Sequence, residues 1–102
     1  MGKRTDLHEE FCELLGTRNA YFQPPANIRM SYPAIRYKLS DVDKLAANDK
    51  AYRLVNRYEV TYIDKNPESD MYLKIIERFP MCSFDRWYVA DNLNHWVFII
   101  YY

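Results

Sequence analysis

The stretch AYRLVNRYEVTYID, residues 51–64, contains the clearest strand pattern in the chain. Apolar and polar residues alternate along it, so one set of side chains faces a core and the other faces away. Asn56 interrupts the apolar set, which is typical of a β-bulge or a polar contact. The strand is about 14 residues long, which exceeds the usual five or six, so its far end is expected to project beyond the domain. The apolar set is Tyr52, Leu54, Tyr58, Val60 and Tyr62.

The segment before this strand alternates in the same way. In YPAIRYKLSD, residues 32–41, Ile35 and Tyr37 point to one side, and Pro33 suits the start of a strand. The polar stretch VDKLAANDK follows and is longer than an ordinary hairpin loop. The sequence therefore predicts a long β-hairpin loop over residues 40–50, which is either functional or only an exposed tip.

Two segments have the periodicity of amphipathic helices. TDLHEEFCELLG, residues 5–16, has Thr5 or Asp6 as its cap and Gly16 as its stop. KNPESDMYLKIIERFP, residues 65–80, has Asn66 as its cap and Pro67 as its first residue. The apolar stripes are Leu7, Phe11, Leu14 and Leu15 in the first helix and Tyr72, Ile75, Ile76 and Phe79 in the second.

The C-terminal stretch CSFDRWYVADNLNHWVFIIYY, residues 82–102, predicts two strands around the turn ADNLN. The last strand is apolar on both faces, as expected of a central strand. One of its faces should lie under the helices. The other face is the candidate for a subunit contact, and it is either the His95, Val97, Ile99 set or the Trp96, Phe98, Ile100 set. Residues 17–30 are expected to form a connector, because Pro24 and Pro25 forbid a helix there.

Together these elements predict one domain over residues 1–102 with the order α-β-β-α-β-β. The expected class is α+β, with a small antiparallel sheet of about four strands and two helices on one face. The other face keeps aromatic side chains, and no further element of this chain is left to cover it. That face, the long strand pair and the apolar C-terminus are the features that suggest an interface.

Charge and length exclude several function classes. Lys and Arg number 14, as do Asp and Glu, so no broad positive field exists for nucleic acid. Arg53 and Arg57 could suggest single-strand binding beside tyrosines, but alternation sends them to the opposite face. No apolar run approaches the roughly 20 residues that span a bilayer, and the two cysteines are expected to be reduced thiols.

Few residues have the spacing that catalysis or metal binding needs. His8, Cys12, Cys82 and His95 show no metal-site spacing, so neither a metal nor another cofactor is expected. Cys82, His95 and Asp91 are the only nucleophile–base candidates, and with 2 glycines in total no glycine-rich oxyanion loop accompanies them. We therefore expect no enzyme, and keep an activity based on Cys82 or His95 as the third hypothesis.

Assembly is the class that the composition favours. The chain has 10 Tyr, 5 Phe and 2 Trp, and Tyr, Trp and Arg are common at the centres of protein interfaces. Ordinary core packing is the alternative for each aromatic residue, and for both tryptophans in particular. The interface candidates are Arg86, Trp87, Tyr88, Trp96, Phe98, Tyr102, Leu45 and Asn48.

Three stretches together carry a family resemblance: NDKAYRLVNRYEVTYIDKNPES, FDRWYVADNLNHWVFIIYY and, more weakly, YFQPPANIRMSYPAIRY. Over residues 21–102 the chain resembles the tail terminator or head-to-tail joining (tail completion) proteins of long-tailed bacteriophages. The resemblance implies a small α+β fold and a virion component assembled in the host cytoplasm. It also implies a homo-oligomeric ring, commonly a hexamer, whose interface uses two different patches of each subunit.

The resemblance further implies the partners of such a ring. They are the tail tube protein and the head–tail connector or stopper protein, with DNA only passing through the channel and no membrane involved. The family has no catalytic residues to transfer to this chain. The second hypothesis is a small, non-enzymatic phage protein that binds and modulates a host protein through the same aromatic surface.

Overall fold

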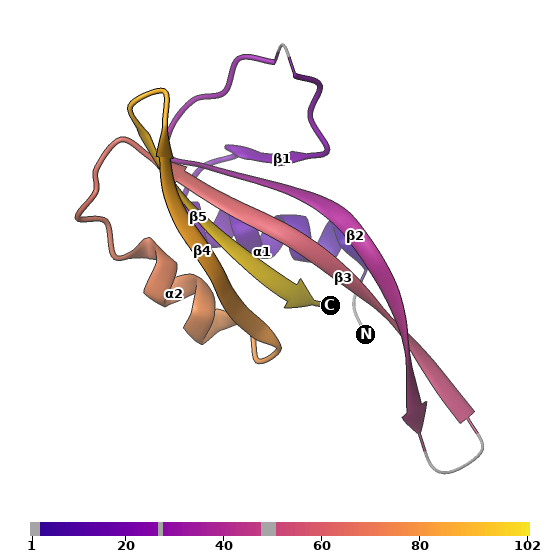
Figure 1. The fold of residues 1–102 in the computed structure, drawn as a ribbon. Coiled ribbons are helices and arrows are strands. Elements are labelled where there is room, and N and C mark those ends of the chain that lie inside the picture. The colour runs from indigo at the N-terminus through magenta and orange to yellow at the C-terminus, as the bar shows by residue number, and fades with distance from the viewer. Residues whose placement is uncertain (1–2, 27, 48–50) are drawn as a thin grey trace.

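The protein has a five-stranded mixed sheet and two helices (Figure 1). The computed structural model describes residues 3–26, 28–47 and 51–102. The α+β class is confirmed, but the four-stranded sheet and the order α-β-β-α-β-β are wrong, because a further strand lies between the first helix and the strand that begins at Ala34. The elements are α1 (Arg4–Leu15), β1 (Ala20–Phe22), β2 (Ala34–Ala47), β3 (Ala51–Asp64), α2 (Met71–Arg78), β4 (Cys82–Ala90) and β5 (Leu93–Tyr101).

The strands lie in the order β1-β2-β3-β5-β4, and only β1 and β2 are parallel. Strand β1 occupies part of the expected connector. Its Ala20 lies opposite Ile35, and the next residue after the strand, Gln23, donates its N–H to the Tyr37 carbonyl at 2.8 Å. A strand of three residues is too short to show an alternation pattern. Only its pairing with a strand that begins 14 positions later in the chain reveals it.

Both helices pack on the same sheet face. Phe11 of α1 meets Tyr37 of β2 with ring centroids 5.0 Å apart, and Tyr72 of α2 stacks on Trp96 of β5 at 5.9 Å. Arg78 of α2 forms ion pairs with two glutamates of α1, which ties the helices together. The sheet residues under the helices are Ile35, Tyr37, Tyr58, Val60, Tyr62, Trp96, Phe98 and Ile100.

The helix ends follow the sequence only in part. Gly16 ends α1 with a φ of 72°, the left-handed conformation that suits glycine at this position. The cap expected at Thr5 or Asp6 is wrong, because Lys3 holds the N-cap position and α1 begins at Arg4. The expected start of α2 is also wrong. Asn66 instead accepts the N–H of Glu68 in a turn, so the helix begins only at Met71.

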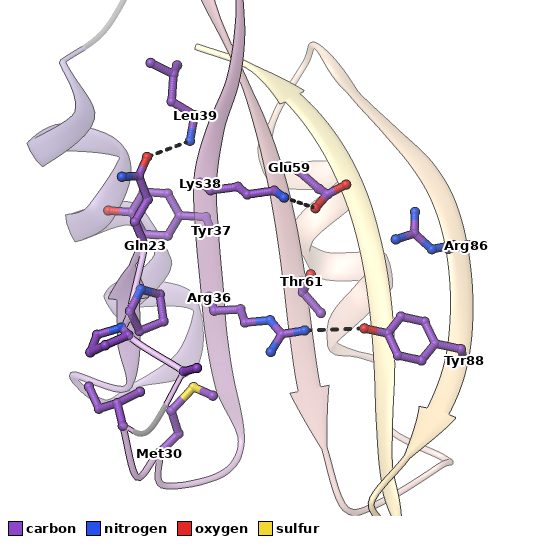
Figure 2. A pocket seen from close by; sticks show the side chains of 14 residues that line it. Gln23, Met30, Arg36, Tyr37, Lys38, Leu39, Glu59, Thr61, Arg86 and Tyr88 are labelled. Carbon is purple, nitrogen blue, oxygen red and sulfur yellow. Dashed lines mark hydrogen bonds and ion pairs between the residues drawn. The ribbon is translucent and has the colours of Figure 1, made fainter.

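The face opposite the helices, called the open face below, is only partly as expected. Tyr88 lies there, but its ring stacks on His95 at 4.5 Å and its hydroxyl accepts a hydrogen bond from Arg36 at 3.4 Å. Because Arg36 is on β2 and Tyr88 on β4, this contact spans the two strands between them (Figure 2). Side chains of the same chain therefore cover part of a face that was expected to be bare. The His95, Val97, Ile99 set of β5 faces this side, and the Trp96, Phe98, Ile100 set faces the helices.

The loop expected over residues 40–50 is mostly strand. Strands β2 and β3 stay paired as far as Ala47 opposite Ala51, while residues 48–50 lie outside the described part of the chain. Strand β1 pairs with β2 only up to Tyr37, and β5 pairs with β3 only from Arg57 onward. The strand residues between 41 and 55 therefore form a two-stranded projection, called the arm below (Figure 1). It lengthens the molecule to 49 Å against 26 and 23 Å in the other directions.

The core predicts a strong contrast between two phenylalanines that form one cross-strand pair. Phe98 is fully buried, Phe84 is 46% exposed, and their rings are 5.6 Å apart. Phe98→Ala should cost about 3–5 kcal/mol of unfolding free energy because it leaves a cavity. Phe84→Ala, the matched control, should cost about 1 kcal/mol or less because its ring is already half in water. Urea unfolding measures both, and equal losses would contradict this assignment of the core.

Candidate functional site

The arm is the first candidate site, because its strands lack neighbours. A two-stranded ribbon alone is at best marginally stable in water. The register places Leu39 beside Tyr58 and Val42 beside Asn56, and Leu54 is two residues from Asn56 on β3. Strand alternation therefore puts Leu39, Val42 and Leu54 on the helix side of the sheet. All three are exposed, at 43%, 46% and 50%. They are called the arm stripe below, and Leu39 lies at the base of the arm, opposite Tyr58.

A β-bulge makes this stripe continuous. The register between β2 and β3 shifts between Leu39 and Asp41, so two residues of β2 lie opposite Arg57. Without the shift, Leu39 and Val42 would point to opposite faces, since they are three positions apart. Asp41 and Asp43 then lie on the open-face side of the arm, beside Arg57 and Val55. The arm therefore carries Val42 and Leu54 with Asn56 on one face, and Asp41 and Asp43 with Arg57 and Val55 on the other.

The second candidate surface lies at the other edge of the sheet. Strand β4 is the last strand, so its outer backbone edge has no partner in this chain. Phe84 and Trp87 lie opposite Phe98 and Trp96, which places them on the helix side. The exposed apolar residues of this region are Phe84, Trp87 and Val89 of β4 and Leu73 and Ile76 of α2, and they are called the edge patch below.

The helix geometry explains why two residues of α2 belong to this patch. At 100° per residue, Leu73 and Ile76 lie on the side of α2 opposite Arg78. Arg78 faces α1, since it pairs with Glu10 and Glu13. Leu73 and Ile76 therefore point away from α1. Ile76 was expected in the inward stripe, but it is 36% exposed, whereas Ile75 is fully buried.

The structure separates the eight sequence-predicted interface residues. Trp87 belongs to the edge patch, and Arg86 and Tyr88 lie on the opposite face of the same strand. Trp96 and Phe98 are buried in the core of their own chain, at 5% and 0% exposure. Tyr102 is half-buried against Phe79 and donates its hydroxyl to Glu10, and burial raises its pKa to about 12. The side chain of Leu45 and the whole of Asn48 lie outside the described residues.

Sequence reasoning missed Leu73, Phe84 and Val89 as surface residues. Phe84, Trp87 and Val89 all lie on one face of β4. They do so because the register shifts between Phe84 and Arg86, which interrupts the alternation there. The shift hides this pattern, because strict alternation from Phe84 would separate it from Trp87. An apolar side chain on an edge strand is also indistinguishable from a core side chain until the strand order is known.

A pocket of about 520 Å³ lies where the segment after β1 passes over the open face (Figure 2). Its floor contains Arg36 and Lys38, and Lys38 Nζ lies 3.5 Å from Glu59 Oε2. Leu39 donates its N–H to Gln23 Oε1 at 3.2 Å, which holds the segment against β2. The wall away from the sheet is formed mainly by Pro24, Pro25, Ala26, Ile28 and Met30.

The pocket contains groups that can bind an anion or a peptide. Arg36 and Arg86 line it, and Arg86 forms an ion pair with Asp85. A guanidinium and a phenol hydroxyl can hold a carboxylate or phosphate, but no thiol or imidazole lines the pocket. Within the described ranges, no three His, Cys, Asp or Glu side chains lie close enough to share a metal ion.

The fold does not bring the Cys–His candidates together. Cys82 lies opposite Ile100 at one end of the β4–β5 pair, and His95 lies opposite Tyr88 toward the other end. Five positions along a strand correspond to roughly 16 Å, and the two side chains lie on opposite faces. Burial also raises the pKa of the Cys82 thiol to about 11, so it is a neutral thiol at physiological pH.

The two metal-ligand candidates of α1 are also hydrogen-bonded or buried. His8 Nδ1 lies 2.6 Å from the Tyr37 hydroxyl, and Cys12 is buried with a raised pKa because of desolvation. In the described part of the chain, no helix is both long and apolar enough to cross a membrane.

The environment of His95 predicts a pH effect on stability. Burial lowers the pKa of its imidazole below the usual 6.5, and the charge of Arg36 acts in the same direction. The folded protein binds this proton less readily than the unfolded chain, so stability is highest above about pH 7 and falls as the pH drops through 6.5. The urea midpoint should therefore be lower at about pH 5.5 than at about pH 7.5.

The variant His95→Gln should lose part of this pH dependence, because it removes the titrating ring. Glu68→Gln, at an exposed position on the turn before α2, is the control and should leave the difference between the two midpoints unchanged. An identical pH dependence in His95→Gln and the unaltered protein would contradict the role given to this ring.

No protein-family model, no curated protein and no solved structure matches this chain. A function is therefore inferred from its own contacts and exposed surfaces, and from the resemblance described above.

Proposed function

We propose that this protein is a non-enzymatic structural protein that assembles with copies of itself into a ring. The observation that carries the proposal is the arm. It is a two-stranded ribbon that leaves the sheet with an exposed apolar stripe, and among the described residues no further strand pairs beside it. Such a ribbon is marginally stable in water, and docking on a neighbouring molecule would remove its apolar stripe from solvent.

The position of the exposed apolar residues supports a head-to-tail arrangement. The arm stripe and the edge patch lie on different parts of the chain, at opposite edges of the sheet. An interface that joins two different patches is heterologous, and it closes into a ring when the rotation between subunits allows it. The net charge of zero also sets up no long-range repulsion between copies.

The resemblance to phage tail proteins suggests where this ring would lie in a virus particle. We propose a virion protein at the tail end or neck of a long-tailed phage, most simply a hexamer, which terminates the tail tube and joins it to the head connector. Its partners would be the tube protein and the connector or stopper protein, and DNA would only pass through the channel. The α+β fold and the absence of a Cys–His pair in the described geometry are compatible with this role.

Removal of the arm should separate folding from assembly. Replacing residues 43–55 by an Asn-Gly turn joins Val42 to Asn56, which are opposite each other in the register. The thermal midpoint should change by only about 5 °C or less, because Val55 is the one buried side chain among the described residues of the deleted segment. Assembly, measured by sedimentation velocity and native mass spectrometry with and without tail tubes, should be lost.

A point variant tests the stripe without shortening the chain. Val42→Asp should weaken assembly, whereas Ile28→Asp, at a similarly exposed residue outside the arm, is the matched control and should assemble normally. An unaltered protein that remains monomeric at every concentration, even with tail tubes, would overturn the proposed function.

Electron microscopy of particles made without this protein tests the phage role. Tails of uncontrolled length would support a terminator, and full heads without tails would support a joining protein. Normal particles, together with one stoichiometric host protein recovered with the chain from a lysate, would instead favour the host-binding hypothesis.

A further inference from the structure

The strand order provides two unpaired backbone edges that fit each other. We propose that the arm segment of β2, residues 40–47, adds to the outer edge of β4 in the next copy of this chain, so that the sheet continues from subunit to subunit. This inference rests on the proposed self-assembly and names the surfaces that would carry it. The occupant of the edge patch is therefore a second copy of the same chain.

The first argument is the direction of the strands. Strand β2 runs antiparallel to β3, β3 antiparallel to β5, and β5 antiparallel to β4, so β2 and β4 run in opposite directions within one subunit. If a second copy is placed beside β4 without turning it over, its β2 runs antiparallel to that β4. Antiparallel strands form regular ladders, so no subunit has to be inverted to make this pairing.

The second argument is which backbone edges are free. On one side of the sheet, β1 pairs with β2 only opposite residues 35–37, so no described strand pairs with the outer edge of β2 along the arm, where the Val42 N–H donates to Asp41 Oδ1. On the other side, the outer edge of β4 is unpaired along residues 82–90. The two free stretches are similar in length. Exposed edges of this kind are the usual sites of strand addition.

The third argument is the match of the two faces. Because neither copy is inverted, the helix sides of both sheets point the same way. The arm stripe then lies beside Phe84, Trp87 and Val89 of the edge patch, and apolar surface covers apolar surface. A one-residue slip in register would place the acidic side of the arm against these residues.

Charge complementarity on the opposite face supports the same arrangement. Asp41 and Asp43 lie on the open-face side of the arm, and Arg86 lies on the open-face side of β4, opposite Val97. Arg86 now has only the adjacent, exposed Asp85 as its ion-pair partner among the described residues. The proposed pairing would bring one or both aspartates of the neighbour toward this guanidinium.

Pairing of β4 with β4 around a two-fold axis is the main rival arrangement. It would bring the Arg86 side chains of both copies to the same seam and leave the arm uncovered. It would also stop at a dimer, because each copy would have used its only long edge outside the arm. The head-to-tail pairing uses both unpaired edges.

Site-directed cross-linking distinguishes these arrangements. In a Cys82→Ser background, Val42→Cys chains are mixed with Val89→Cys chains and treated with a short bismaleimide. We expect a covalent dimer that contains one chain of each kind, and none from either chain alone. Thr17→Cys, an exposed position just after α1, replaces Val89→Cys as the control and should give no product.

Charge reversal gives an independent measurement. Arg86→Glu should raise the dissociation constant for assembly about tenfold or more, because the pairing would bring its new carboxylate toward the acidic Asp41 and Asp43 side of the neighbouring arm. Changing Asp41 and Asp43 to Lys in the same chain should restore most of the affinity. Arg29→Glu changes the net charge equally in an exposed loop and should have little effect.

The outcomes separate this inference from the proposed function. If the unaltered protein assembles, two results would overturn the strand addition and leave self-assembly standing. One is a covalent dimer formed from Val89→Cys chains alone, and the other is an unchanged dissociation constant after the charge reversal. Unaltered protein that never assembles would overturn both. A mixed-chain cross-link together with rescue by the double reversal would support the shared sheet.

Discussion

The fold depends on one face of β3. Tyr58, Val60 and Tyr62 lie on the helix side and pair laterally with β2 on one side and β5 on the other. Because cross-strand neighbours share a face, this single alternation aligns the apolar sets of three strands into one surface. The two short helices can persist only by docking on that surface, since isolated helices of this length are unstable in water.

The same arrangement produces the surfaces that remain exposed. Strands β2 and β3 are longer than the strands beside them, so their far ends leave the sheet as the arm. Strand β4 follows α2 and returns to the outside of β5, which makes it an edge strand. The arm stripe and the edge patch are therefore two consequences of one strand order, and both continue the apolar side of the sheet. A partner that extends the sheet would cover both.

The candidate site was only partly predictable because apolar residues look alike in sequence. Trp87 and Trp96 face each other across the β4–β5 pair, yet the first is 53% exposed and the second 5%. The difference is that Tyr72 of α2 stacks on Trp96, whereas no aromatic ring among the described residues stacks on Trp87. The sequence does not indicate that Leu73 belongs to an exposed apolar surface. A single exposed leucine on a short helix is common, and only the neighbouring surface shows that it is part of a patch.

The residue pattern alone predicts the class of fold, the long strand of residues 51–64, the central position of the last strand and the turn at Asp91 and Asn92, whose φ angles are positive. These follow from side-chain periodicity and turn chemistry, which act over a few neighbouring residues. The second element, β1, the late start of α2, the arm and the faces of the described interface candidates follow only from the tertiary structure. Those features depend on which distant strands pair and in what order, and local sequence carries no direct record of that choice.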